Sequence, residues 1–150
     1  MKPIQKLVLA AAMLAVSIPA FPQGSTQKLE GSWLIAITVD GAPGPFTIDM
    51  ATFDGKGGLT VIPSDRSESA AVGSYHRVAD REFLSTHTHI LYNDKGTFAG
   101  IAKVIAQEKV SESGNELSGR YRVEISDVNG KVVAKILGTI AGKPVIPEPL

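Results

Sequence analysis

The 150-residue chain contains no cysteine and no excess of either charge, with 15 basic and 15 acidic residues. The absence of cysteine excludes a disulfide framework and a lipid anchor on a cysteine sulfur, so the fold depends on its core alone. The balanced charge gives no indication of binding to nucleic acid or to an anionic membrane surface. We therefore expect neither as a partner.

Long apolar runs are also missing, except at the N-terminus. The first six residues carry two lysines, and a continuous apolar segment over 7–16 precedes Ser-Ile-Pro-Ala at 17–20. A positive start, a short apolar run and a small final residue are typical of an export signal, and the run is too short to span a bilayer. We predict a signal peptide over residues 1–20, cleavage near Ala20, a periplasmic or secreted location, and no stable membrane insertion afterwards.

Helical periodicity is absent, and the remaining sequence is typical of strands. Short runs rich in Val, Ile, Thr, Tyr and Phe alternate with clusters of Gly, Asp and Asn. We predict eight strands, at 30–39, 46–54, 58–63, 71–79, 82–92, 97–110, 116–127 and 131–141. Because every connection is short, sequential antiparallel pairing is expected, and it closes eight strands into an all-β, up-and-down β-barrel.

A single domain is expected after signal cleavage. Removing residues 1–20 leaves 150 − 20 = 130 residues, which is enough to bury one core without covalent crosslinks. A flexible lead over 21–28 is predicted to precede the barrel domain at 29–142. A Pro-rich tail over 143–150 is predicted to follow it.

The predicted strands 82–92 and 97–110 form a hairpin that places histidines inside the barrel. Pairing Tyr92 with Thr97 puts one uncharged face of the hairpin inward. This face consists of Phe83, Ser85, His87, His89 and Leu91 opposite Ala106, Val104, Ala102, Gly100 and Phe98. The opposite face carries Lys103 and Gln107 and is expected to face solvent or a partner.

A two-residue turn at Asp80-Arg81 would bring the third histidine to the same interior. This turn pairs Ala79 with Glu82, so that Ser74 and His76 point inward. A slip of one residue would instead send His76 outside and bring Tyr75 and Arg77 inside.

The chemistry of the histidines stays open. Three imidazoles on adjacent strands could bind zinc or act as general acids and bases, whereas histidines in a barrel are commonly hydrogen-bonded to serine or threonine. The sequence contains no H-E-x-x-H motif for a metal and no G-x-S-x-G motif for a serine hydrolase. We predict no metal and no cofactor, and we assign no catalytic residue.

The final hairpin is predicted from Asn129-Gly130, a strong two-residue turn that pairs Val128 with Lys131. Counting back from this turn places Tyr121 across from Gly138, as an aromatic side chain covering a strand glycine. Gly138 and two other strand glycines, at 100 and 119, are separated by equal intervals in the sequence. These glycines could leave room beside a ligand, or they could allow the strands to bend around a small barrel.

The start of the first strand carries the first family resemblance. Gly31-Ser32-Trp33 resembles the G-x-W signature of lipocalins, in which the tryptophan closes one end of an eight-stranded barrel that carries small hydrophobic ligands. The overall pattern is similar to bacterial proteins with a barrel like that of allene oxide cyclase. The segments that carry this similarity are 53–58 (FDGKGG), 73–77 (GSYHR), 96–100 (GTFAG) and 117–119 (LSG).

These observations lead to a hypothesis about function and leave two alternatives. We expect an exported barrel that binds a small, largely apolar molecule in its interior. The alternatives are a cyclase or isomerase that uses the same cavity, and a structural or interaction barrel with a filled core. The residues predicted to contact the ligand are Trp33, Ser74, His76, Ser85, His87, His89 and Tyr121.

Aliphatic residues are also expected on the outer face of the barrel, more of them than a free monomer usually exposes. They are Leu34, Ile62, Ile101, Ile105, Val133 and Leu137. A homo-oligomer is the expected explanation, and packing of the Pro-rich tail against this face is the alternative.

Overall fold

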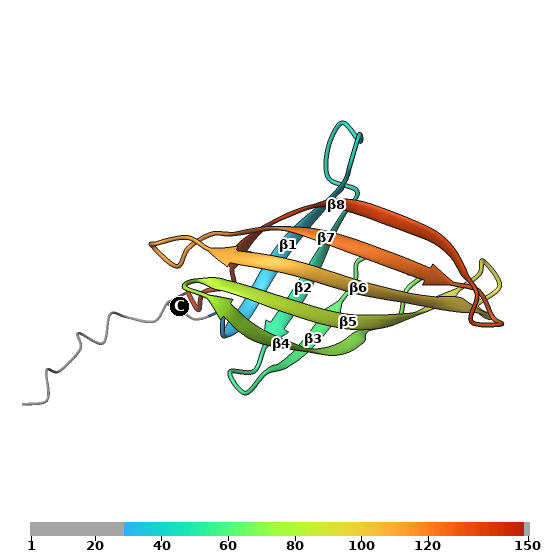
Figure 1. Ribbon diagram of the computed structural model, residues 1–150, viewed down its shortest axis with the longest axis horizontal. Coiled ribbons are helices and arrows are strands. Elements are labelled where there is room, and N and C mark those ends of the chain that lie inside the picture. Colours follow the sequence, from blue (N-terminus) through green and yellow to red (C-terminus); the bar gives the residue numbers. More distant parts are fainter. Residues whose placement is uncertain (1–28, 149–150) are drawn as a thin grey trace, which may run out of the picture.

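The computed structural model describes residues 29–148, which form a closed barrel of eight antiparallel strands (Figure 1). The strands are β1 (Gly31–Val39), β2 (Thr47–Phe53), β3 (Gly58–Ile62), β4 (Ala71–Ala79), β5 (Glu82–Tyr92), β6 (Phe98–Val110), β7 (Leu117–Ser126) and β8 (Val132–Pro144). They pair in chain order, and β8 closes the barrel against β1.

This architecture confirms the predicted fold class. The predicted bounds hold to within one residue, except that β8 runs three residues further than expected. The predicted signal peptide and flexible lead lie outside the described residues. Within residues 29–148, no helix is long and apolar enough to cross a membrane.

The two ends of the barrel differ in what covers them. The loops at 40–46, 63–70, 93–97 and 127–131 lie at one end, which we call the mouth, because successive strands alternate in direction. The other end, called the floor, holds the start of β1 and the end of β8. The loop at 40–46 projects well away from the barrel wall in Figure 1.

Apolar side chains fill the floor. Trp33 is buried there, and its indole Nε1 donates a hydrogen bond to the Leu29 carbonyl at 2.9 Å. Phe53 and Tyr75 meet edge to face, with ring centroids 5.0 Å apart. Val110 is also fully buried in this cluster. The floor is therefore a packed core that closes one end of the barrel.

The register of the β5–β6 hairpin differs from the prediction by two residues. Tyr92 pairs with Phe98 instead of Thr97, which is a shift of one residue. A bulge beside Leu91 adds a second residue to the shift, so that His87 pairs with Val104. A shift of two residues keeps the side chains from Ala102 to Ala106 inside, because side chains alternate with a period of two. Phe98 lies beyond the bulge, pairs with Tyr92 and is exposed, so the prediction that it faces inward is wrong. It also extends the inward row to Glu108, so the expectation of an interior face without charge is wrong.

The β4–β5 hairpin corrects the placement of Ser74 and His76. Ala79 pairs with Glu82 as predicted, but a bulge between Arg77 and Ala79 shifts the rest of β4 by one residue. Ser74 and His76 therefore lie on the exposed face, and the prediction that they point inward is wrong. The observed register is the one-residue slip that the sequence left as the alternative.

This correction removes the three-histidine interior. With His76 outside, only His87 and His89 face the inside of the barrel, so the zinc site built from all three imidazoles is wrong. Tyr75 takes the inward position instead, and the Arg77 guanidinium lies 5.5 Å from the centre of the Phe83 ring.

The β7–β8 hairpin reaches the predicted register by a different turn. Asp127 starts a five-residue loop closed by its N–H to the Lys131 carbonyl at 2.9 Å, so the predicted pairing of Val128 with Lys131 is wrong. A bulge at the end of β7 compensates for the longer loop. Tyr121 consequently pairs with Gly138 as predicted.

The strand glycines lie where neighbouring backbone comes very close. A Cβ on Gly100, Gly119 or Gly138 would lie 2.1, 2.2 or 2.1 Å from a carbonyl oxygen of the adjacent strand. No side chain fits at that distance. The glycines therefore allow the strands to coil tightly, which supports the bending explanation over room for a ligand.

Candidate functional site

A cavity of about 330 Å³ runs through the barrel from the mouth toward the floor. Its lining is mostly aliphatic, with Ile35, Val61, Val104 and Ile140 among the contributors. Space is left over β6, because the inward residues Ala102 and Ala106 are small and stand opposite His89 and Ser85. The interior is therefore an open cavity above a packed floor, which decides a question that the sequence left open.

Glu108 supplies the deepest polar group of this cavity. Its side chain comes from the floor half of β6 and is only 3% exposed. The Ser85 hydroxyl donates a hydrogen bond to Glu108 Oε1 at 2.5 Å, whereas Oε2 is buried and finds no hydrogen-bond partner within residues 29–148. Burial raises the pKa of Glu108 to about 7. The group therefore carries a proton for part of the time at neutral pH.

His87, on β5, lines the same cavity as a neutral imidazole. Burial, with a smaller effect of the nearby His89, lowers the pKa of His87 to about 3. Its Nδ1 is buried and has no hydrogen-bond partner in the described part of the chain. The rings of His87 and His89 meet edge to face at 5.1 Å. His87 thus offers the cavity an uncharged polar group.

His89 is held by the loop between β3 and β4. The Nδ1 of His89 donates to the Ser69 carbonyl at 2.8 Å, since a carbonyl oxygen can only accept, and Glu68 Oε2 lies 3.7 Å from the same nitrogen. The loop is fixed against β5 by backbone hydrogen bonds, from Ser69 N–H to Ile90 and from Tyr92 N–H to Ser67. A mouth loop thereby brings a carboxylate over the cavity.

Two aspartates complete the acidic lining of the mouth. Asp49, from the start of β2, is buried and accepts hydrogen bonds from the Thr47 hydroxyl and the Ser64 N–H at 3.2 and 3.3 Å. Burial raises the pKa of Asp49 and also that of Glu68. Asp65 accepts hydrogen bonds from the backbone and hydroxyl of Ser67, and these bonds lower its pKa.

The predicted ligand-contacting residues divide into three groups. His87, His89 and Tyr121 line the cavity. Ser85 is buried and bonded to Glu108, and Trp33 belongs to the floor core without lining the cavity. Ser74 and His76 lie on the outside, as corrected above. The roles of the inward residues in binding stay predictions.

Several polar residues of the site were missing from the sequence prediction. Glu108 continues the inward alternation of β6 two residues past Ala106, and Asp49 continues that of Ala51 and Phe53 on β2. Both could have been found by extending the period-two pattern. Glu68 could not, because a loop carries it and only tertiary contacts place that loop.

Fold and site together define a closed antiparallel β-barrel with an acidic, largely apolar interior cavity. No protein-family model, curated protein sequence or solved structure matches this chain.

Proposed function

We propose that the protein is an exported, lipocalin-like barrel that binds a small, largely apolar molecule in its interior. The cavity supports this proposal, because a volume of about 330 Å³ with an aliphatic lining and few polar groups is typical of small-ligand sites. The G-x-W segment at 31–33 adds to it, since Trp33 lies in the core of the floor, below the cavity.

The observation that carries the proposal is that two residues of the cavity lining, Glu108 and His87, each have a buried polar atom without a hydrogen-bond partner in the described chain. Glu108 Oε2 and His87 Nδ1 have no hydrogen-bond partner within the described chain. Leaving such atoms unsatisfied costs about 1–3 kcal/mol each, which is unfavourable unless another molecule satisfies them. A ligand with a polar group and an apolar body would give one of these side chains a hydrogen-bond partner and fill the aliphatic part of the cavity.

A cavity-filling substitution tests this proposal. Ala106 faces inward and lines the cavity, whereas its neighbour Gln107 faces outward and is exposed. We expect Ala106→Phe to weaken binding of the neutral fluorescent probe N-phenyl-1-naphthylamine at least tenfold, because the added ring occupies the binding volume, and Gln107→Phe to leave it unchanged. Circular dichroism checks that both variants fold.

Either of two results would contradict binding in the interior. One is equal probe binding by both variants and the original protein. The other is the absence of probe binding by the original protein, together with a native mass spectrum that never shows a co-purified molecule.

A second function is favoured by Glu108 in particular. A buried carboxyl group with a pKa of about 7, in the same cavity as a neutral imidazole, can give or take a proton near neutral pH, as a cyclisation or isomerisation requires. His87→Ala separates the two functions. Loss of turnover with ligand affinity retained would support the enzyme, and loss of affinity alone would support the binding protein.

A further inference from the structure

The charged groups that line the cavity are all acidic, apart from the two histidines. Four carboxyl groups line it: Asp49, Asp65, Glu68 and Glu108. No lysine or arginine among residues 29–148 does so. Arg66 lies on the same mouth loop as Asp65, but its side chain is exposed and does not line the cavity.

Of the two histidines, His87 does not offset this imbalance. His87 is neutral at any pH near neutrality. His89 already uses its Nδ1 on the Ser69 carbonyl and lies beside Glu68. The mouth carboxylates accept hydrogen bonds from neighbouring Thr and Ser groups, but these neutral donors bring no positive charge.

Glu108 gives the acidic lining a specific point of contact. It is almost completely buried, one of its oxygens is bonded to Ser85, and the other has no partner within residues 29–148. The rows of the sheet order the site by depth, because Ala102, Val104, Ala106 and Glu108 follow one another along β6 from mouth to floor. A ligand would pass the mouth carboxylates first and meet Glu108 last.

We infer that the ligand is an apolar molecule that carries a protonated amine, with Glu108 as the partner of the ammonium group and Asp49 and Glu68 favouring its passage through the mouth. This inference rests on the proposed binding function and names the class of ligand. A cation in this cavity gains charge-assisted hydrogen bonds to carboxylate oxygens. A fatty acid would add a like charge to a buried acidic site whose lining, within residues 29–148, holds no lysine or arginine to pair with it, which is strongly unfavourable.

Three ligands that differ only in the head group test the inference. We would titrate the purified protein with octylamine, octanol and octanoic acid at neutral pH and measure each affinity by calorimetry. Octylamine is expected to bind at least about tenfold more tightly than octanoic acid, and more tightly than octanol, because like-charge juxtaposition costs several kcal/mol.

Variants locate the selectivity. Glu108→Gln keeps the shape of the side chain and removes its charge, so it should weaken octylamine binding about tenfold and leave octanol unchanged. Asp49→Asn is a second variant at the mouth, expected to act in the same direction. Glu124→Gln is the control, because it removes a carboxylate that lies outside the cavity and forms a salt bridge with Lys135.

The outcomes separate the inference from the proposed function. Octanoic acid or octanol binding as tightly as octylamine would overturn the inference and leave the binding function standing. Unchanged selectivity in both Glu108→Gln and Asp49→Asn would also overturn it. Failure of all three ligands and of the neutral naphthylamine probe to bind would overturn the binding function itself.

Discussion

At the scale of single residues, Glu108 is the least conventional feature of the barrel. A carboxyl group buried in a mostly aliphatic cavity lining is costly to ionise, and one hydroxyl from Ser85 compensates only in part. The raised pKa of Glu108 means that the folded protein holds a proton there which the unfolded chain releases at lower pH. Folding stability and site chemistry are therefore linked through this one group.

The linkage predicts how stability depends on pH. Between the ordinary value of 4.5 and the folded value of about 7, the folded state binds more protons at Glu108 than the unfolded state. The free energy of unfolding should therefore fall by about 3 kcal/mol as pH rises through this window. His87 acts in the opposite direction at lower pH, so the contribution of Glu108 has to be measured as a difference between proteins.

Urea unfolding of the original protein and of Glu108→Gln, repeated from acid to neutral pH, measures that difference. The variant should lack the decline and should gain stability relative to the original protein as pH rises. Glu124→Gln serves as the control, because the Glu124 carboxylate is paired with Lys135 on the outer surface. Parallel pH profiles of stability for the original protein and Glu108→Gln would disprove the raised pKa of Glu108 in the folded state.

At the scale of elements, three hairpin loops of the barrel share one hydrogen-bond pattern. Asp54, Asn93 and Asp127 each begin a five-residue hairpin loop and accept two backbone N–H groups on a side-chain oxygen. Glycines at 57, 96 and 130 take up positive φ as the fourth residue of each loop. The bulges beside these and other loops then set which side chains face the cavity.

Strand glycines give the prediction at this scale. Gly119 has no unusual φ, but an added Cβ would lie 2.2 Å from the Gln107 carbonyl. We expect Gly119→Ala to lower the free energy of unfolding by about 2 kcal/mol or more, because the backbone of β6 has to move. Gly44 in a mouth loop has nothing within 4 Å of its added Cβ, so Gly44→Ala is the matched control.

Chemical denaturation of both glycine variants decides the point. Equal stabilities would show that β6 and β7 separate without cost and that tight coiling is not needed for closure.

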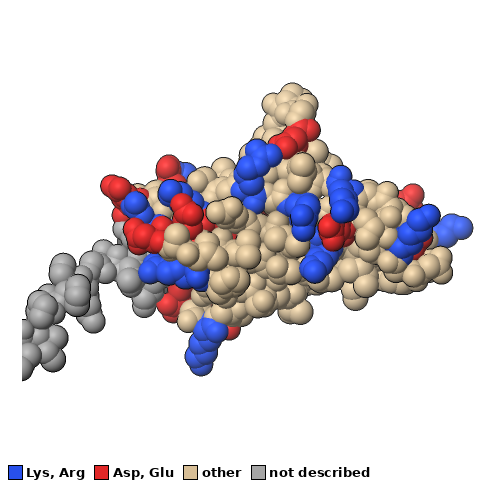
Figure 2. Space-filling model, viewed as in Figure 1, with Lys and Arg blue, Asp and Glu red and all other residues tan. Residues whose placement is uncertain are grey.

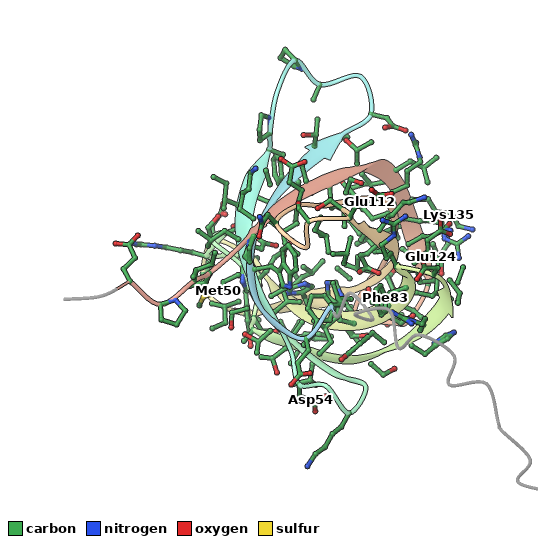
Figure 3. The ribbon with its side chains drawn as sticks, turned by 90° about the vertical axis from the view of Figure 1, so that its left-hand side faces the viewer. Met50, Asp54, Phe83, Glu112, Glu124 and Lys135 are labelled. Atoms are coloured by element: carbon green, nitrogen blue, oxygen red, sulfur yellow. The ribbon has the colours of Figure 1, made fainter. Side chains whose placement is uncertain are left out.

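At the scale of the whole molecule, charge divides the outer wall in two. Figure 2 shows basic and acidic side chains interleaved on the face where β5–β8 lie in front. Salt bridges such as Glu82–Lys109 at 3.0 Å join residues of these strands. The outward residues of β1–β3 include no Lys, Arg, Asp or Glu. Met50 pairs there with both Leu34 and Ile62, and Figure 3 shows it on the side opposite Glu124 and Lys135.

This division sharpens the expectation of self-association. Five of the six residues expected on the outside are exposed, and Ile105 is half-buried. We predict that a second copy covers the uncharged β1–β3 face, so that Met50→Lys lowers the sedimentation coefficient, whereas Gln107→Lys on the charged face does not. A monomer in the original protein, or unchanged sedimentation of Met50→Lys, would refute this.

Local patterns in the sequence were sufficient to determine the barrel. Period-two alternation and Gly, Asp and Asn at the turns define eight strands in the right order, because both depend on neighbours along the chain. The same patterns placed His87, His89 and Tyr121 on the cavity wall.

Only the tertiary structure decided the rest. The bulge that turns His76 outward and the shift that brings Glu108 inward arise where strands adjust to one another around a closed ring. Glu68 reaches His89 because its loop lies along the end of β5. Each of these features depends on contacts between segments distant in sequence, which no local pattern encodes, and together they make the cavity acidic.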